Sequence, residues 1–201
     1  KFNNAGSYHV ELEVSNDNGS TVTTKTNYID VIDYCTPAVS IPGIADVGIN
    51  NVEIENIAHV TSSGVAPGYS NYTKDQIVTL VPGQTYSLEV ERNTTVNGMT
   101  RKAWIDFNRD GEFQEPAERI MLETNANTTS NTVTFTVPDY TYTVEGESRL
   151  RIGASLGAAS FNPCGPIQVG EFEDYGVLLA YDNMPPVITL NGNDTVYVEV
   201  N

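Results

Sequence analysis

The sequence predicts an all-β protein built on an antiparallel β-sandwich of the jelly-roll or Ig-like type. Short runs in which apolar and polar residues alternate recur at intervals of about 8–15 residues, as strands do in sandwiches. Gly, Asn, Asp and Pro residues, which favour turns, separate these runs. The chain also holds 11 Tyr and 6 Phe among many Val and Ile residues, so it can form a folded core despite its net charge of −16.

The first 33 residues predict a β-hairpin. Residues 7–14 alternate with a period of two, a turn-rich stretch follows at 16–19, and alternation resumes over residues 22–31. An isolated hairpin is marginally stable in water, so we expect it to close a larger sandwich whose other strands lie upstream. The sequence from Gly6 to Gly19 resembles the closing hairpin of a polycystic-kidney-disease (PKD) domain, an Ig-like module.

Residues 34–182 predict the sandwich itself, with a helical turn only within residues 115–123. The predicted strands are 51–57, 76–81, 86–92, 102–107, 132–137, 148–154 and 175–181. After them, Pro185 and Pro186 interrupt any ladder and favour a linker, and residues 195–200 alternate again. Residues 183–201 therefore predict a linker and the first strands of another bacterial Ig-like domain.

Two cysteines lie near the two ends of the predicted sandwich. In a cytosolic protein Cys35 and Cys164 would be unrelated buried thiols, but in a strand-dominated chain rich in Thr, Asn and Gly we expect one disulfide. Closing so long a loop would stabilise the fold by about 4–5 kcal/mol. The bridge predicts a secreted or cell-surface protein.

The charge and motifs exclude several functions. With 26 acidic and 10 basic residues, the surface repels nucleic acid and anionic lipid, and no apolar run reaches the length of a membrane helix. His9 and His59 lie in no zinc-ligand spacing, and phosphate-binding or nucleophile motifs are missing. The number of acidic residues alone does not exclude a glycosidase carboxylate pair, but the closely spaced carboxylates are better explained by metal binding or by a structural role. We therefore expect no catalytic activity.

The stretch after Trp104 predicts a calcium site. Oxygen-bearing side chains at alternate positions, followed by a glycine, form a DxNxDG loop, and Ca²⁺ binds six to eight oxygens. An EF-hand loop would place its last carboxylate at Ala117, whereas here it comes one residue later, and the preceding residues are typical of a strand. The predicted ligands are Asp106, Asn108, Asp110, Glu112 (through its carbonyl) and Glu118. The alternative is an Asx-rich turn without metal.

Residues 170–176 carry three carboxylates within four positions, which repel one another unless a cation offsets them. Alternation places Glu171 and Glu173 on one face and Asp174 on the other. One interpretation is an edge strand with a solvated acidic face. The other is that Glu173 or Asp174 contacts the metal or the nearby Arg149 and Arg151.

A resemblance to the GEVED domain family extends over residues 34–182 in order. It rests on the segments 34–37, 68–72, 82–86, 103–111, 148–152, 163–165 and 170–175. Phe172 stands where the family name implies Val. The resemblance implies a β-sandwich module of large secreted or surface proteins, typical of marine and gliding Bacteroidetes-type bacteria, and it implies no enzyme.

Two functions follow as expectations. In the first, the module binds a polysaccharide, such as a sulfated marine one, and tethers another domain of the same chain to it. Aromatic rings and cations would form the site. The predicted ligand-binding residues are Tyr69, Tyr72, Arg101, Arg109, Tyr140 and Tyr142. The alternative for each tyrosine is strand packing, and the second function is a spacer or adhesion module with no ligand of its own beyond Ca²⁺.

Overall fold

The structure is a computed structural model of the 201-residue chain, and it describes residues 4–42, 47–61, 68–92, 96–157 and 160–181. Over these ranges the regular secondary structure consists of strands. They are β1 (Gly6–Asn16), β2 (Gly19–Val31), β3 (Val39–Pro42), β4 (Asn51–Ile54), β5 (Ile57–Val60), β6 (Tyr69–Asn71), β7 (Ile77–Leu80), β8 (Thr85–Glu91), β9 (Met99–Ile105), β10 (Arg119–Ala126), β11 (Ser130–Thr136), β12 (Gly146–Leu156) and β13 (Ile167–Leu179). The described residues contain no helix long and apolar enough to cross a membrane.

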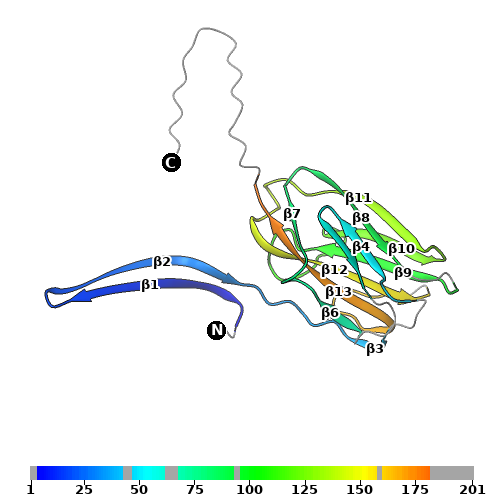
Figure 1. Ribbon diagram of the computed structural model, residues 1–201, viewed down its shortest axis with the longest axis horizontal. Coiled ribbons are helices and arrows are strands. Elements are labelled where there is room, and N and C mark those ends of the chain that lie inside the picture. The colour runs from blue at the N-terminus through cyan, green and yellow to red at the C-terminus, as the bar shows by residue number, and fades with distance from the viewer. Residues whose placement is uncertain (1–3, 43–46, 62–67, 93–95, 158–159, 182–201) are drawn as a thin grey trace, which may run out of the picture.

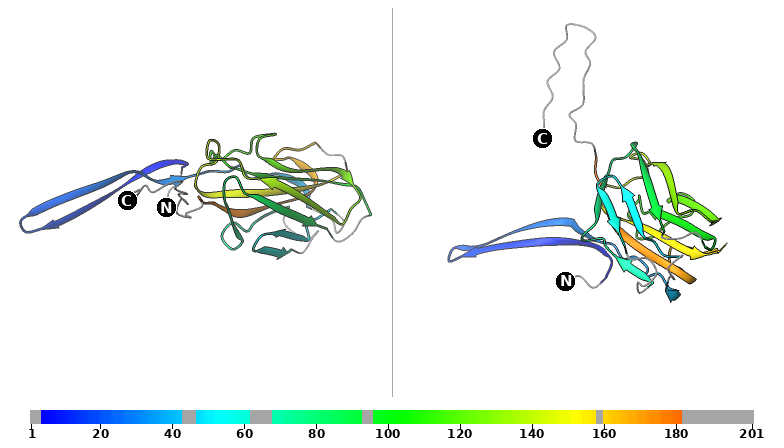
Figure 2. Two further views of the ribbon diagram at one scale, coloured as in Figure 1. Left: turned by 90° about the horizontal axis from the view of Figure 1, so that it is seen from above. Right: turned by 45° about the vertical axis from the view of Figure 1, so that its right-hand side comes forward.

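The predicted N-terminal hairpin is confirmed. Strands β1 and β2 pair antiparallel around the turn at Asn16–Gly19 and extend away from the rest of the molecule (Figures 1 and 2). One face of the hairpin carries Leu12 and Val14, which are 62% and 58% exposed. An exposed apolar face of this kind is expected of strands that belong to a larger sandwich.

The predicted sandwich is confirmed, and it consists of two sheets. The larger sheet has the order β10-β9-β12-β13, and three short strands, β3, β6 and β7, pair with the remaining edge of β13. The smaller sheet has the order β11-β8-β4-β5. Figure 1 shows the two sheets facing one another, with β13 running the length of the larger one.

The larger sheet is mixed, which the sequence did not predict. Strand β13 is antiparallel to β12 but parallel to β3, β6 and β7. The three parallel strands lie one after another along β13, starting opposite Ile167, Phe172 and Gly176. Side-chain alternation gives no information about the direction of the partner strand, so the sequence pattern could not distinguish parallel from antiparallel pairing.

The main core lies between the sheets, and a second apolar layer covers the outer face of the larger sheet. This second layer consists of Trp104, Phe113, Phe161, Ile167 and Phe172. Gly153 lies beneath it, and a Cβ there would come within 2.7 Å of the rings of Phe161 and Phe172. As a result β9, β12 and β13 are buried on both faces.

The structure rejects one of the two interpretations of residues 170–176 and shows the turn expected within residues 115–123. Residues 170–176 do not form a solvated edge strand, because β13 lies between β12 and the three parallel strands. The segment 115–123 holds a single turn at 115–118, in which the Glu118 N–H donates to the carbonyl of Gln114, four residues earlier, at 2.8 Å, and β10 begins at Arg119. The predicted strand in residues 183–201 lies outside the described residues.

Candidate functional site

The Asp174 side chain lies on the outer face of β13 and is bound by two arginines from β12. Arg151 donates from Nε and Nη2 to the two carboxylate oxygens at 2.7 and 2.8 Å, and Arg149 donates from Nη1 at 2.8 Å. The Tyr69 hydroxyl donates to the same carboxylate at 2.7 Å. The register pairs Arg151 directly with Asp174, so strand geometry alone brings the charges together. One of the alternatives drawn from the sequence, contact with these arginines, is confirmed.

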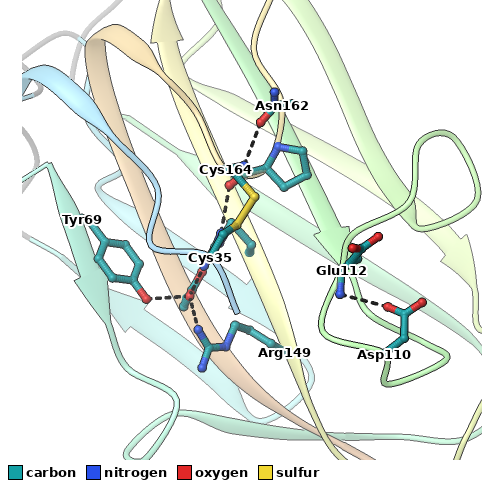
Figure 3. Close-up of a disulfide and its surroundings, with 10 residues drawn as sticks. Cys35, Tyr69, Asp110, Glu112, Arg149, Asn162 and Cys164 are labelled. Carbon is teal, nitrogen blue, oxygen red and sulfur yellow. Dashed lines mark hydrogen bonds and ion pairs between the residues drawn. A yellow bond between two sulfur atoms is a disulfide. The ribbon is translucent and has the colours of Figure 1, made fainter. Parts of the chain in front are cut away.

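The predicted disulfide is confirmed and lies beside this cluster. Cys35 and Cys164 are joined with 5.7 Å between their Cα atoms. The remaining nitrogen of Arg151, Nη1, donates to the Pro163 carbonyl at 2.9 Å and contacts Cys35 Sγ at 3.2 Å. Figure 3 shows the bridge beside the Tyr69 and Arg149 side chains, both of which donate to Asp174.

Tyr34 connects the Asp174 cluster to the predicted calcium loop. The Arg149 guanidinium lies over the Tyr34 ring at 4.2 Å, and the Tyr34 hydroxyl donates to Asp106 Oδ2 at 2.7 Å. Burial raises the pKa of Tyr34, and the negative charge of Asp106 raises it further. Sequence reasoning missed this role, since nothing marks Tyr34 apart from its position before Cys35.

The other two carboxylates of the strand point into the main core and have no cationic partner among the described residues. Glu171 accepts from the backbone N–H of Ile49 at 2.9 Å, and Glu173 accepts from the Tyr175 hydroxyl at 2.8 Å. Glu173 Oε1 is buried without a hydrogen-bond donor in the described structure. Burial, together with the negative charge of Glu171, raises the pKa of Glu173 to about 8. Glu173 therefore carries a proton at neutral pH.

An aromatic group closes this end of the core. His59 Nδ1 lies 3.0 Å from the Tyr175 hydroxyl, and the Tyr72 ring packs edge-on against His59 at 4.4 Å. Either partner can donate in the His59–Tyr175 hydrogen bond, depending on which ring nitrogen of His59 carries the proton. Burial lowers the pKa of His59, which favours its neutral form. Tyr72 is thus engaged in packing, as the alternative for this tyrosine anticipated.

The predicted calcium ligands lie in one loop between β9 and β10, but their oxygens accept hydrogen bonds from within the protein. Asp106 accepts from the N–H groups of Asp110 and Gly111, at 3.3 and 3.0 Å. Gly111 has φ = +87°, and its own Cβ would lie 2.7 Å from the Asp33 carbonyl, so the turn requires glycine. Asp110 accepts from the Glu112 N–H at 2.9 Å, as drawn in Figure 3.

Glu118 holds the two ends of this loop together. It is fully buried and accepts from the N–H groups of Phe107, at 2.8 Å, and Gln114, at 2.9 Å. Burial raises its pKa to about 6, and the charge of Asp106 contributes. Within the described ranges no three His, Cys, Asp or Glu side chains converge on a common point suited to a metal. The oxygen donors suit Ca²⁺ chemically, but Glu118 as placed serves the backbone.

The six predicted ligand-binding residues do not form one surface. Arg101 is fully buried, and it donates to Glu123 at 2.5 Å and to the Val90 carbonyl at 2.5 Å, so it offers no surface to an outside ligand. Tyr69 is held by Asp174, as described above. Tyr140 is 58% exposed and packs against Tyr181, with 4.8 Å between ring centroids.

Tyr142 contacts the loop between β9 and β10, and Arg109 belongs to that loop. The Tyr142 hydroxyl is 3.3 Å from Gln114, and burial raises its pKa to about 12. Arg109 donates to the backbone carbonyls of Glu145, at 2.6 Å, and Glu147, at 2.9 Å. Of the predicted set, Arg101 is buried, Tyr140 is exposed, and the other four, Tyr69, Tyr72, Arg109 and Tyr142, are half-buried.

Comparison with known proteins finds a family similarity for one part of the chain. No curated protein sequence matches it. Among solved structures, the crystal structure of the periplasmic chaperone SfaE shares 18% identity with a TM-score of 0.33; the likeness covers 57% of this chain and 57% of the chaperone, less than two thirds of its length. Residues 100–178, from β9 through most of β13, match the model of the GEVED domain. This span is thus similar to the GEVED domain family. It includes the loop between β9 and β10, the two arginines of β12 and most of the acidic strand β13.

Proposed function

We propose that the chain is a non-catalytic part of a secreted or cell-surface bacterial protein, and that residues 34–182 act as a spacer of fixed length that bears tension. The observation that carries the proposal is the position of the disulfide. Cys35 lies where the chain enters the sandwich, and Cys164 lies three residues before β13, the strand after which the chain leaves it. On this proposal the hairpin at residues 1–33 closes a PKD-like domain, and residues 183–201 begin an Ig-like one.

Tension applied through the flanking domains would follow a short covalent route. It would pass from Cys35 across the disulfide to Cys164 and then along β13. A β-strand is already close to the full extension of the chain, so β13 can lengthen very little. The residues between the two cysteines, which include β3 to β12, would lie outside the loaded route.

The buried charge network supports this route. Arg151 contacts Cys35 Sγ and both oxygens of Asp174 on β13, so it ties the disulfide to the loaded strand. On the other edge of β13, the three parallel strands hold it along its length. These side chains serve the fold, which agrees with a module whose acidic motif binds no substrate.

Single-molecule extension of the whole chain, held by handles at its two ends, tests the proposal. The oxidised chain should show no unfolding step from the segment between the cysteines. After reduction, or in a Cys35→Ser and Cys164→Ser double variant, unfolding should add a step of about 450 Å, since the sequence separation is 129 residues at about 3.3–3.6 Å each. A long step in the oxidised chain would overturn the proposal.

Calcium belongs to this proposal as a stabiliser of the loop after β9. The support is the oxygen donor set of Asp106, Asn108 and Asp110 together with the mutual repulsion of Asp106 and Glu118, which a cation would offset. The ion would stiffen the loop and carry no reaction.

A second function, polysaccharide binding, is supported by one specific feature. A cavity of about 630 Å³ lies where the hairpin meets the sandwich, and it contains Arg109, Tyr28 and Tyr34. Pockets of this size bind small ligands and single sugar units. Binding there would let the module hold the rest of the chain on its polymer.

A further inference from the structure

The cavity at the junction of hairpin and sandwich is lined by segments that are distant in sequence. The end of β2 and the linker contribute Tyr28 and Tyr34, and the turn before β7 contributes Lys74. The loop between β9 and β10 contributes Arg109, and β12 contributes Arg149. Three of the chain's 10 basic residues therefore line this cavity, but only two of its 26 acidic residues do, Asp30 and Glu147. Basic residues therefore outnumber acidic ones in the lining of this cavity, whereas acidic residues predominate in the chain as a whole.

Two of the three cations of the cavity have no carboxylate partner among the described residues. Among the described residues, no carboxylate lies within ion-pair distance of Lys74 or Arg109, whereas Arg149 pairs with Asp174. Arg109 is held in place by the carbonyls of Glu145 and Glu147, which orient its guanidinium without removing its charge. Arg149 shares Asp174 with Arg151, so that group of three keeps one net positive charge.

Two tyrosine rings accompany these charges. Tyr28 is 60% exposed, and Lys25 lies over its ring at 4.5 Å. Tyr34 is held by Arg149 over its ring and by Asp106 at its hydroxyl, so its orientation is set before any ligand arrives. A pre-oriented ring next to a cation offers one surface for the apolar face of a sugar and one for an acidic group on it.

We propose that this cavity binds an acidic sugar unit, carrying a carboxylate or a sulfate ester, of a polysaccharide. The inference rests on the second proposed function and names its site. Lys74 and Arg109 would contact the acidic group, and Tyr28 would contact the ring. An acidic peptide would use the cations as well, but extended peptides are bound mainly along strand edges and grooves, and a cavity walled by several separate segments is neither.

Affinity electrophoresis of the whole chain tests the proposal, with dextran sulfate, polygalacturonate, neutral dextran or poly-L-glutamate in the gel at 0.15 M salt. At that ionic strength charges beyond about 8 Å are screened, so the distant carboxylates contribute little. The acidic glycans should retard the protein, and the other two polymers should not. Lys74→Gln should weaken retardation about threefold and Arg109→Gln about tenfold, because a guanidinium can bind an acidic group through two hydrogen bonds and an ammonium binds it as a point charge.

Arg119→Gln is the matched control, because it removes one positive charge outside the cavity, from an ion pair with Glu115. A thermal melt of each variant confirms folding. Retardation that is unchanged in both cavity variants would overturn this site while leaving polysaccharide binding intact. If the acidic glycans do not retard the wild type, both this site and the proposed polysaccharide binding are overturned. The proposed tension-bearing role is not affected by that result. Equal retardation by dextran or poly-L-glutamate would show that the site does not select acidic sugars, which overturns the proposal as well.

Discussion

Buried carboxylates on the two faces of β13 are stabilised in different ways. On the outer face, Asp174 is bound by Arg149, Arg151 and Tyr69. On the inner face, Glu173 has no cation within reach among the described residues and keeps its proton instead, with Tyr175 as its hydrogen-bond donor. Both residues are fully buried, so exposure does not explain the difference.

What separates the faces is the strand next to β13. On β12, arginines alternate with apolar residues, so one face of the pair receives two guanidinium groups and the other receives Leu150 and Ile152. A buried carboxylate is tolerated with a partner or as a neutral acid, and the neighbouring strand decides which applies. Acidic residues within four positions of one strand thus have two different structural roles.

The largest effect should come from the disulfide beside the outer face. Replacing both cysteines, Cys35→Ser with Cys164→Ser, should lower the free energy of unfolding by about 4–5 kcal/mol, because the bridge closes a loop of 129 residues in the unfolded chain. Urea unfolding measures this. A change below about 1 kcal/mol would mean that the bridge constrains little.

The ion pair on the outer face should come next. Arg151→Met leaves Asp174 with a single, partly exposed arginine, and we expect a loss of about 3–5 kcal/mol. Arg149→Met is the matched control, since its side chain is 19% exposed and its loss should cost about 1–2 kcal/mol. Urea unfolding of the two variants checks the ranking. Equal losses would argue against the particular role given to Arg151.

The inner face should respond to pH. The folded-state pKa of Glu173, about 8, exceeds its ordinary value of 4.5, so the folded chain holds a proton that the unfolded chain releases. Stability contributed by this group is therefore full below pH 4.5 and lost as pH rises to about 8, with a slope of up to about 1.4 kcal/mol per pH unit.

Glu173→Gln should remove this slope, because glutamine stays neutral. The measurement is the free energy of unfolding of wild type and variant at several pH values between about 5 and 9, and their difference isolates Glu173 from Glu171, Glu118 and His59. Glu55→Gln, an exposed turn position, serves as control. If the two curves run parallel, Glu173 is ionised in the folded state and the contrast between the faces fails.

Calcium removal should have the smallest effect, because it acts at the loop between β9 and β10, which belongs to neither face of β13. EDTA should lower the melting temperature by about 5–10 °C if Ca²⁺ is present at about a hundred times its dissociation constant. Asp110→Asn should abolish that response. It is a gentler change than one at Asp106, since Asp110 is exposed and Asp106 is buried. A melt that is insensitive to EDTA would show that the loop is an Asx-rich turn.

Much of the fold could be predicted from the sequence because alternation reports which face of a strand is buried. The hairpin, the sandwich, the disulfide and the opposed faces of residues 171–174 all follow from that pattern and from cysteine spacing. The parallel strands did not follow, because β3 and β6 are only four and three residues long and alternation carries no direction.

The burial of Arg101, one of the six predicted ligand-binding residues, could not be predicted from the sequence. Arg101 lies on β9, whose residues are all buried, and its partners Glu123 and Thr128 come from the following segment. A lone arginine in a strand is more often on the surface, and only the sheet order shows that β9 is covered on both sides. The cavity beside Tyr34 was missed for a related reason, since its walls come from separate segments that only the fold brings together.

A double-mutant cycle between Arg151 and Asp174 tests the central claim, that the acidic strand serves the structure of the protein, most directly. The free energies of unfolding of wild type, Arg151→Gln, Asp174→Asn and the double variant give the coupling between the two side chains. We predict a coupling of about 3 kcal/mol, because both groups are fully buried and bound through two hydrogen bonds. A coupling below about 0.5 kcal/mol would contradict the claim.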